Sequence, residues 1–162
     1  MEIERKFNLL AFPDLPEMER LDQWQGYLVT SPQVRIRHTV NHTEQSETYI
    51  LCIKSNGDLV RHEVETEITK EQFDELSGML EYPLIHKELH AYRLDDGLVL
   101  ECSCVDDGAF AYAEVEFSTE EQAMAWQIPQ ALINCLGGEM TYEKGFKMTS
   151  YWSNRELAKA IR

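Results

Sequence analysis

A chain of 162 residues with 43% hydrophobic residues is long enough to bury a substantial core, which excludes wholesale disorder. Its 29 acidic and 15 basic residues give a formal charge of −14, which disfavours nonspecific binding to nucleic acid or acidic membranes. No run approaches the roughly 18 apolar residues of a membrane span, and no signal-peptide core follows Met1. We therefore expect a single cytoplasmic domain over residues 1–162.

The cysteines fit that compartment as reduced thiols. They are Cys52, Cys102, Cys104 and Cys135. None belongs to a Cys-x-x-Cys pair, so the sequence favours packing thiols over a zinc site. We interpret all of them as packing residues.

The first predicted element begins Met1-Glu2-Ile3-Glu4-Arg5-Lys6. As a strand it places Glu2, Glu4 and Lys6 on one face, about 7 Å apart along the chain. Two carboxylates and an ammonium in a row can hold a divalent cation and contact a phosphate group at the same time. Solvated strand faces carry such residues routinely, so this segment alone does not establish a site.

Short segments of β-type residues recur along the chain. Several are separated by Asn56-Gly57, Asp96-Gly97 or Asp107-Gly108, which favour tight antiparallel hairpins. About eight strands at hairpin spacing predict a mostly antiparallel sheet that curls into a barrel. The expected strands cover residues 2–10, 24–30, 33–40, 46–55, 59–68, 86–94, 98–105 and 109–117.

Helices are expected between and after the strands. Thr69-x-x-Gln72 forms a capping box before apolar residues at helical spacing, and Ser118-x-x-Glu121 opens a second helical region. A further helix is expected after Pro129, ending at Gly137-Gly138. A terminal helix is predicted from Ser153, and a brief helical turn within residues 13–21.

Alternation gives each strand an apolar and an ionic face. Val34 and Ile36 alternate with Arg35 and Arg37, and the later strands place glutamates and apolar residues on opposite parities in the same way. The ionic faces either lie in water or converge inside a closed barrel. Periodicity alone does not distinguish these arrangements, although mixed charge on an inner wall is costly without a ligand or function.

Several segments together resemble the CYTH superfamily, the triphosphate tunnel metalloenzymes. Met1–Phe7 resembles the N-terminal Glu-x-Glu-x-Lys signature of that family, and the remaining segments follow in the family's order. They are Gln25-Gly26-Tyr27-Leu28, Val34-Arg35-Ile36-Arg37, the lysine strand Tyr49–Lys54, the arginine and glutamate strand Arg61–Ile68, Pro83–Lys87 and Ala113-Glu114-Val115-Glu116-Phe117. The resemblance implies an α+β fold, an eight-stranded antiparallel tunnel with an ionic interior and flanking helices.

The resemblance also implies a site along the tunnel. The cations would grip a linear triphosphate, and the acidic residues would hold Mg²⁺ or Mn²⁺, because hard divalent cations prefer carboxylate oxygens. The implied phosphate contacts are Lys6, Arg35, Arg37, Lys54, Arg61 and Lys87. The implied metal ligands are Glu2, Glu4, Glu63, Glu65, Glu101, Glu114 and Glu116. Lys6 and Lys87 are also the candidate catalytic residues, since a lysine with a lowered pKa can assist proton transfer.

Two features depart from the family pattern. Small members often carry an arginine two positions after the lysine of the 86–94 strand, where this chain has Leu89. Arg93 shares the parity of Lys87 but lies farther along the strand. The C-terminal Tyr142–Lys147 segment matches only loosely, and Lys144 and Lys147 are equally explained as tunnel or solvated residues.

The resemblance implies metal-dependent hydrolysis of a short triphosphate, inorganic tripolyphosphate above all, with nucleoside triphosphates as weaker substrates. Class IV adenylate cyclase and thiamine triphosphatase are alternative enzymes on the same tunnel. A module that binds polyphosphate or nucleotide without turnover is the alternative of another class, favoured by Leu89. The expected partner is a small-molecule triphosphate, with neither nucleic acid nor membrane, and a homodimer is left open.

Overall fold

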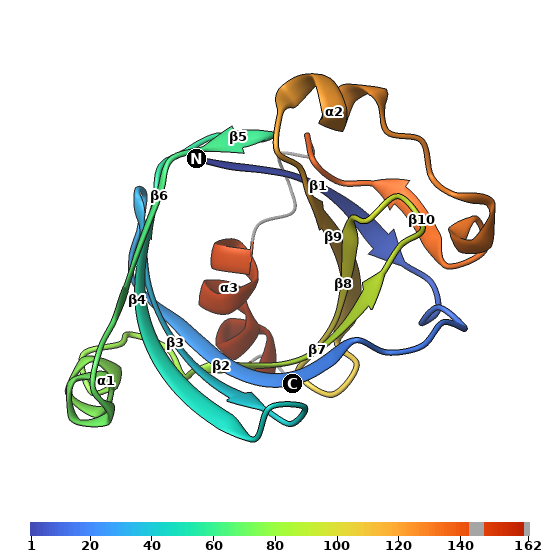
Figure 1. Cartoon of the computed structure of the whole chain (residues 1–162). Coiled ribbons are helices and arrows are strands. Elements are labelled where there is room, and N and C mark those ends of the chain that lie inside the picture. The colour runs from blue at the N-terminus through green and yellow to red at the C-terminus, as the bar shows by residue number, and fades with distance from the viewer. Residues whose placement is uncertain (143–147, 161–162) are drawn as a thin grey trace.

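The strands of the computed structural model form one antiparallel sheet that curls into a nearly closed barrel, viewed along its bore in Figure 1. The structure describes residues 1–142 and 148–160, with side chains through Asn154. The strands are β1 (Glu2–Leu9), β2 (Glu19–Thr30), β3 (Gln33–Asn41), β4 (Ser46–Lys54), β5 (Val60–Arg61), β6 (Glu63–Glu67), β7 (Ile85–Arg93), β8 (Val99–Val105), β9 (Phe110–Glu116) and β10 (Leu136–Glu139). The α+β barrel prediction is confirmed.

The barrel closes through the segment that the sequence predicts as one strand over 59–68. In the structure this segment divides at His62 into β5 and β6. The first part pairs with β1, where Glu2 faces Arg61, and the second pairs with β4, where Lys54 faces Glu63. The division raises the strand count above the predicted eight, as does β10, which pairs with the end of β1.

Two predicted helices flank the barrel on its outside. Helix α1 (Lys70–Ser77) begins at the capping box of Thr69 and Gln72, and its buried Phe73 packs 5.4 Å from the ring of Tyr49 on β4. Helix α2 (Glu120–Ala125) begins after Thr119, one residue later than the predicted Ser118 cap. No described helix combines the length and apolar character that a membrane span requires.

The prediction of a helix from Pro129 to Gly137-Gly138 is wrong. Only a 3₁₀ turn, η1 (Gln130–Leu132), follows Pro129, and the two glycines belong to β10. An added Cβ at Gly137 would lie 3.3 Å from the Cβ of Asn8, so this glycine permits the close approach of β10 to β1. The predicted helical turn within 13–21 is also wrong, because residues 13–18 contain no helix and β2 begins at Glu19.

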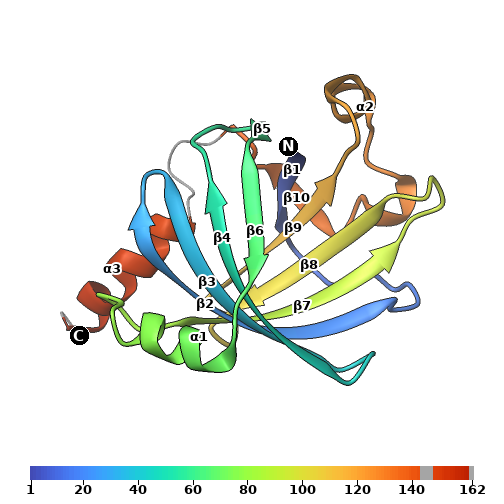
Figure 2. The same cartoon turned by 60° about the vertical axis from the view of Figure 1, so that its left-hand side comes forward.

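Helix α3 (Met148–Ala160) begins five residues before the predicted Ser153. Figure 1 and Figure 2 show it lying across one end of the barrel. Its Trp152 is 3% exposed, donates a hydrogen bond from Nε1 to the Pro83 carbonyl at 2.8 Å, and packs against Tyr27 and Tyr82. The helix therefore covers this end with an aromatic cluster.

The main hydrophobic core lies outside the barrel wall, because the apolar strand faces point away from the bore. Phe7, Leu100 and Val115 are at most 1% exposed on this outer face. Leu132 of η1 and Leu136 of β10 cover them. The ionic faces therefore point inward, which settles the ambiguity that alternation leaves.

We predict that Leu100→Ala lowers the free energy of unfolding by about 2–5 kcal/mol, because it removes buried methyl groups from this outer core. Val64→Ala is the matched control, since Val64 is 65% exposed on the outer face of β6. Urea unfolding of both variants measures the difference. An equal loss in the two would contradict a core on the outside of the wall.

Candidate functional site

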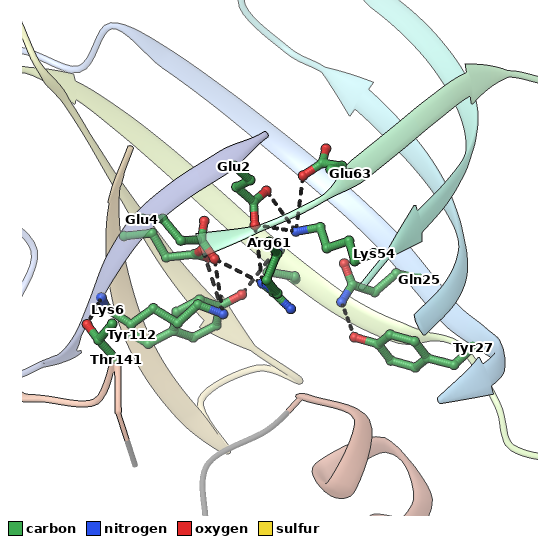
Figure 3. Close-up of polar contacts among 12 residues, drawn as sticks. Glu2, Glu4, Lys6, Gln25, Tyr27, Lys54, Arg61, Glu63, Tyr112 and Thr141 are labelled. Atoms are coloured by element: carbon green, nitrogen blue, oxygen red, sulfur yellow. Dashed lines mark hydrogen bonds and ion pairs between the residues drawn. The ribbon is translucent and has the colours of Figure 1, made fainter. Parts of the chain in front are cut away.

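The pairing register of the strands determines which side chains meet on the inner wall of the barrel. Antiparallel pairing of β1 with β9 sets Glu4 opposite Glu116 and Lys6 opposite Glu114. The same parity continues around the barrel through neighbouring strands, and Figure 3 shows the resulting side chains converging from separate strands. Residues that are far apart in the sequence thus face one bore.

The cationic half of the bore is a polar cavity of about 100 Å³ next to α3. Met148 of α3 and Thr141 help to line it, with Gln25, Tyr27, Tyr112 and Glu114. Five of the six predicted phosphate contacts also line it, namely Lys6, Arg35, Lys54, Arg61 and Lys87. Arg37 is not among the lining residues, and its Nη2 lies 3.6 Å from Glu65 Oε1.

The acidic half lies at the other side of these cations. Glu2, Glu63, Glu65 and Glu116 line a cavity of about 240 Å³ together with Met1. Glu101 and Glu116 line a neighbouring cavity of about 590 Å³. Glu114 lines the cationic cavity, and Glu4 is paired with Lys6 and Arg61. The predicted acidic residues are therefore gathered, but they divide between the acidic cavities and the cationic one.

Ion pairs join the two halves. Lys54 Nζ lies 2.9 Å from Glu2 Oε2 and 3.5 Å from Glu63 Oε2. Arg61 Nη2 donates at 3.2 Å to both Glu2 and Glu4. Lys6 Nζ lies 3.4 Å from Glu4 and 3.9 Å from Glu114. These pairs compensate part of the desolvation cost of each buried charge.

The carboxylates nevertheless repel one another. Burial, and then the charge of Glu114, raise the pKa of Glu4 to about 8. Burial and Glu114 also raise the pKa of Glu101 to about 7. Burial alone would raise the pKa of Glu114 as well. The charge of Lys6, a hydrogen bond with Glu4, and the charge of Lys87 instead hold the pKa of Glu114 well below its usual range. Burial and mutual repulsion therefore make this pair of carboxylates bind a proton more readily than two isolated glutamates would.

The two candidate catalytic lysines differ in their surroundings. Burial lowers the pKa of Lys87 to about 8, with Arg35 and Arg37 adding to the effect against the opposing charge of Glu114. The pKa of Lys6 is instead raised, because Glu114 and Glu4 outweigh its burial. Lys87 Nζ also donates a hydrogen bond to Tyr112 Oη at 3.1 Å. Only Lys87 has the lowered pKa that proton transfer near neutral pH requires.

The acidic donor set fits a hard divalent cation. Glu2, Glu63, Glu65 and Glu116 offer only carboxylate oxygens around one cavity, the ligands that Mg²⁺ and Mn²⁺ prefer. The raised pKa values of Glu2 and Glu116 show that burial there leaves negative charge incompletely compensated. A bound cation would compensate this remaining negative charge.

Sequence reasoning missed Tyr112 and Cys52. Tyr112 shares the inward parity of Glu114 and Glu116 on β9, so alternation was the available signal. Cys52, assigned to packing, lies beside Glu63 and Glu65. Tyr27, which the family segment singles out, both lines the cavity and accepts a hydrogen bond from Gln25 Nε2 at 3.2 Å.

The structure also locates two of the residues at which the sequence departs from the family pattern, Leu89 and Arg93. Leu89 is 4% exposed on the inner wall, paired with Leu21 of β2 and Ser103 of β8. Arg93 lies at the end of β7 with Nη2 3.6 Å from Met18 Sδ, so it does not replace an arginine at position 89. Lys144 and Lys147 lie outside the described residues.

A nearly closed antiparallel barrel with cationic and acidic halves on its inner wall defines the triphosphate tunnel class, and the chain belongs to this family, the CYTH superfamily. An inorganic triphosphatase of Nitrosomonas europaea is 33% identical over an alignment of 165 residues, which covers 99% of this chain and 98% of the relative. The crystal structure of the inorganic triphosphatase NE1496 matches with a TM-score of 0.62 and 28% identity, over 94% of each chain.

A more distant structure agrees in fold alone. HpAC1 from Hippeastrum, described as a putative adenylyl cyclase with a dominant triphosphatase activity, is 20% identical with a TM-score of 0.52, over 76% of this chain and 83% of its own. No family model matches the chain. Membership therefore rests on the relative that is matched over its full length.

We predict that the metal-free protein loses stability as pH rises from about 5 to about 8. The folded state binds more protons than the unfolded state in this window, because the pKa of Glu4 rises from 4.5 to about 8, and stability falls with pH wherever that holds. Thermal unfolding in EDTA measures the slope. Glu4→Gln should flatten it, and a melting temperature that rises across the window would contradict the prediction.

Proposed function

We propose that this protein hydrolyses inorganic tripolyphosphate to pyrophosphate and phosphate, with Mg²⁺ or Mn²⁺ as cofactor. The cavity that gathers Lys6, Arg35, Lys54, Arg61 and Lys87 beside an acidic half is the observation that carries the proposal. A linear triphosphate presents repeated anionic groups that match cations spread over several strands. The triphosphatase activity named for the 33% identical relative supports the same substrate.

Substrate binding would exchange partners within existing ion pairs. Lys54 and Arg61 already hold their charged ends near Glu2 and Glu4 at 2.9–3.2 Å. Phosphate oxygens would take over these cations, and a divalent cation would take over the carboxylates. Because the charges are held on strands before binding, little reorganisation is needed.

The proposed metal ligands are Glu2, Glu4, Glu63, Glu65, Glu101, Glu114 and Glu116. A divalent cation bound there would supply charge neutralisation on the phosphate oxygens and acidify a coordinated water. Glu114 also fixes the ammonium of Lys6, and the buried Arg35 orients the phosphate chain. Arg37, which is paired with Glu65, would contact phosphate nearest the acidic half.

Lys87 is the proposed proton acceptor. Its pKa of about 8 leaves a fraction of the amine neutral near pH 7.5, so Nζ can accept a proton from the attacking water. Tyr112 Oη accepts a hydrogen bond from Nζ and thereby orients the amine toward the cavity. Lys6, with its raised pKa, stays charged and binds phosphate.

Other activities on the same tunnel give different products. Adenylate cyclase would form cyclic AMP from ATP, and thiamine triphosphatase would release phosphate from thiamine triphosphate. Tyr27 and Tyr112 line the cavity as the aromatic groups available to a bulky substrate. A non-catalytic module would bind tripolyphosphate with metal and release no product. We also propose that the protein acts in the cytoplasm, where its free thiols persist.

We predict phosphate release from tripolyphosphate with Mg²⁺ or Mn²⁺ and none with EDTA. Glu4→Gln should lower the rate by at least about 10-fold, because loss of even an outer-shell partner of a metal ligand typically lowers activity by that factor. Glu75→Gln, an exposed carboxylate on α1, is the matched control and should behave as wild type. Tight metal-dependent binding without product would instead support the binding module, and cyclic AMP from ATP would support the cyclase.

Lys87→Gln and Lys6→Gln should separate proton transfer from binding. We expect Lys87→Gln to lower kcat by about 10²–10⁴-fold, the usual contribution of a general base. Lys6→Gln should act mainly by raising KM, because a lost contact to a charged group costs about 1.5–3 kcal/mol. Steady-state kinetics across pH measures both, and the acidic limb of the kcat profile should disappear only in Lys87→Gln. A pH profile unchanged by Lys87→Gln would contradict the assignment.

A further inference from the structure

One buried thiol lies on the inner wall beside the acidic half. Cys52 on β4 is paired with Glu65 on β6, and Glu63 lies two residues before Glu65 on the same face. One ligand atom from each of Cys52, Glu63 and Glu65 lies within 4.8 Å of the others. Among the side chains that the structure describes, in residues 1–142 and 148–154, this is the single group of His, Cys, Asp and Glu gathered so closely.

Neither a disulfide nor a hydrogen bond within the described residues explains why a thiol is buried at this position. Cys52 is a free cysteine, 1% exposed, and no hydrogen bond to its Sγ occurs within the described part of the chain. It faces Arg35 of β3 across the other pairing edge of β4. A packing thiol is normally surrounded by apolar groups, as Cys102 is in the outer core. Cys52 is instead surrounded by charge.

The three residues form a graded path from solvent. Glu65 is exposed, Glu63 half-buried and Cys52 buried, and both glutamates line the open acidic cavity that includes Met1. Cys52 is buried and does not line this cavity, so a cation that enters it would meet the carboxylates before the sulfur. The end of the path therefore offers a soft ligand that Mg²⁺ does not use.

We propose that Cys52, Glu63 and Glu65 form a site for a thiophilic divalent cation, Zn²⁺ in particular, on the wall of the tunnel. Sulfur binds Zn²⁺ at about 2.3 Å and carboxylate oxygen at about 2.0–2.2 Å, so small side-chain movements bring three donors at this spacing onto one ion. The thiol proton passes to solvent as the Zn–S bond forms. A fourth position stays open to water.

This site has a consequence for activity that rests on the proposed function. Glu63 and Glu65 are also proposed ligands of the catalytic Mg²⁺ or Mn²⁺. Zn²⁺ held by Cys52 would withdraw both carboxylates from that ion, so it would inhibit hydrolysis and excess Mg²⁺ would relieve the inhibition only in part. Binding of the thiophilic ion can be tested without any turnover.

Cd²⁺ is the probe, because a Cd–thiolate bond gives an ultraviolet charge-transfer absorption that carboxylate ligation does not. The experiment uses the full-length chain carrying Cys104→Ser and Cys135→Ser, which removes the two more accessible thiols. We expect one equivalent of Cd²⁺ to give the band, and Zn²⁺ to displace it. Adding Cys52→Ala should abolish the band and weaken Cd²⁺ binding by at least about 10-fold, as even outer-shell losses do.

Cys102→Ala in the same background is the matched control, since Cys102 is equally buried but lies in the outer core. It should keep the band. Glu63→Gln, which leaves the thiol in place, should weaken Cd²⁺ binding without removing the band at saturation. Loss of the band in Cys102→Ala, its persistence in Cys52→Ala, or no band in the parent would each overturn the site.

Mg²⁺-dependent tripolyphosphate hydrolysis by Cys52→Ala separates the two proposals. Hydrolysis that persists in Cys52→Ala but resists Zn²⁺ supports both the function and the site. A thiolate band in a protein without hydrolysis would leave the metal site standing and reject the proposed function. Circular dichroism confirms that each variant is folded before it is compared.

Discussion

The structure depends on the pairing of opposite charges inside a barrel whose apolar faces point outward. A buried ion costs several kcal/mol unless a partner repays it, so neither the lysines and arginines nor the glutamates could occupy this wall alone. Lys54 between Glu2 and Glu63, and Arg61 between Glu2 and Glu4, meet that requirement. The outer core then supplies the hydrophobic stabilisation that a conventional barrel interior would provide.

The same pairing prepares the site for an anionic ligand and a cation together. In the proposed function, phosphate and metal would present the charges that the wall residues already present to each other, so binding would exchange one neutralised set for another. This explains how a chain with a charge of −14 can hold a polyanion. Leu89, beside Leu21 and Ser103, is an uncharged part of this wall, and in the proposed function it would limit where the phosphate chain finds cations.

Much of this arrangement was predictable from the sequence. Alternation along the strands placed Arg35 and Arg37 on the opposite face from Val34 and Ile36. The family resemblance indicated that the ionic faces point inward. Register was not predictable, because cross-strand partners depend on where strands bend. The division at His62 and the pairing of Gly137-Gly138 with β1 arose from that geometry. Lys6 and Lys87 look alike in sequence, and only burial and neighbouring charges distinguish their pKa values.

Closure of the barrel depends on β1. Its residues pair with β9 along one edge and with β5 and then β10 along the other. All three partners are synthesised later, the last ending at Glu139. The backbone of β1 is therefore fully paired only after β10, more than 120 residues later in the sequence, has been made. Such long sequence separations slow folding and leave the early strand exposed to wrong partners. Its charged face, with Glu2, Glu4 and Lys6, discourages those associations during that interval.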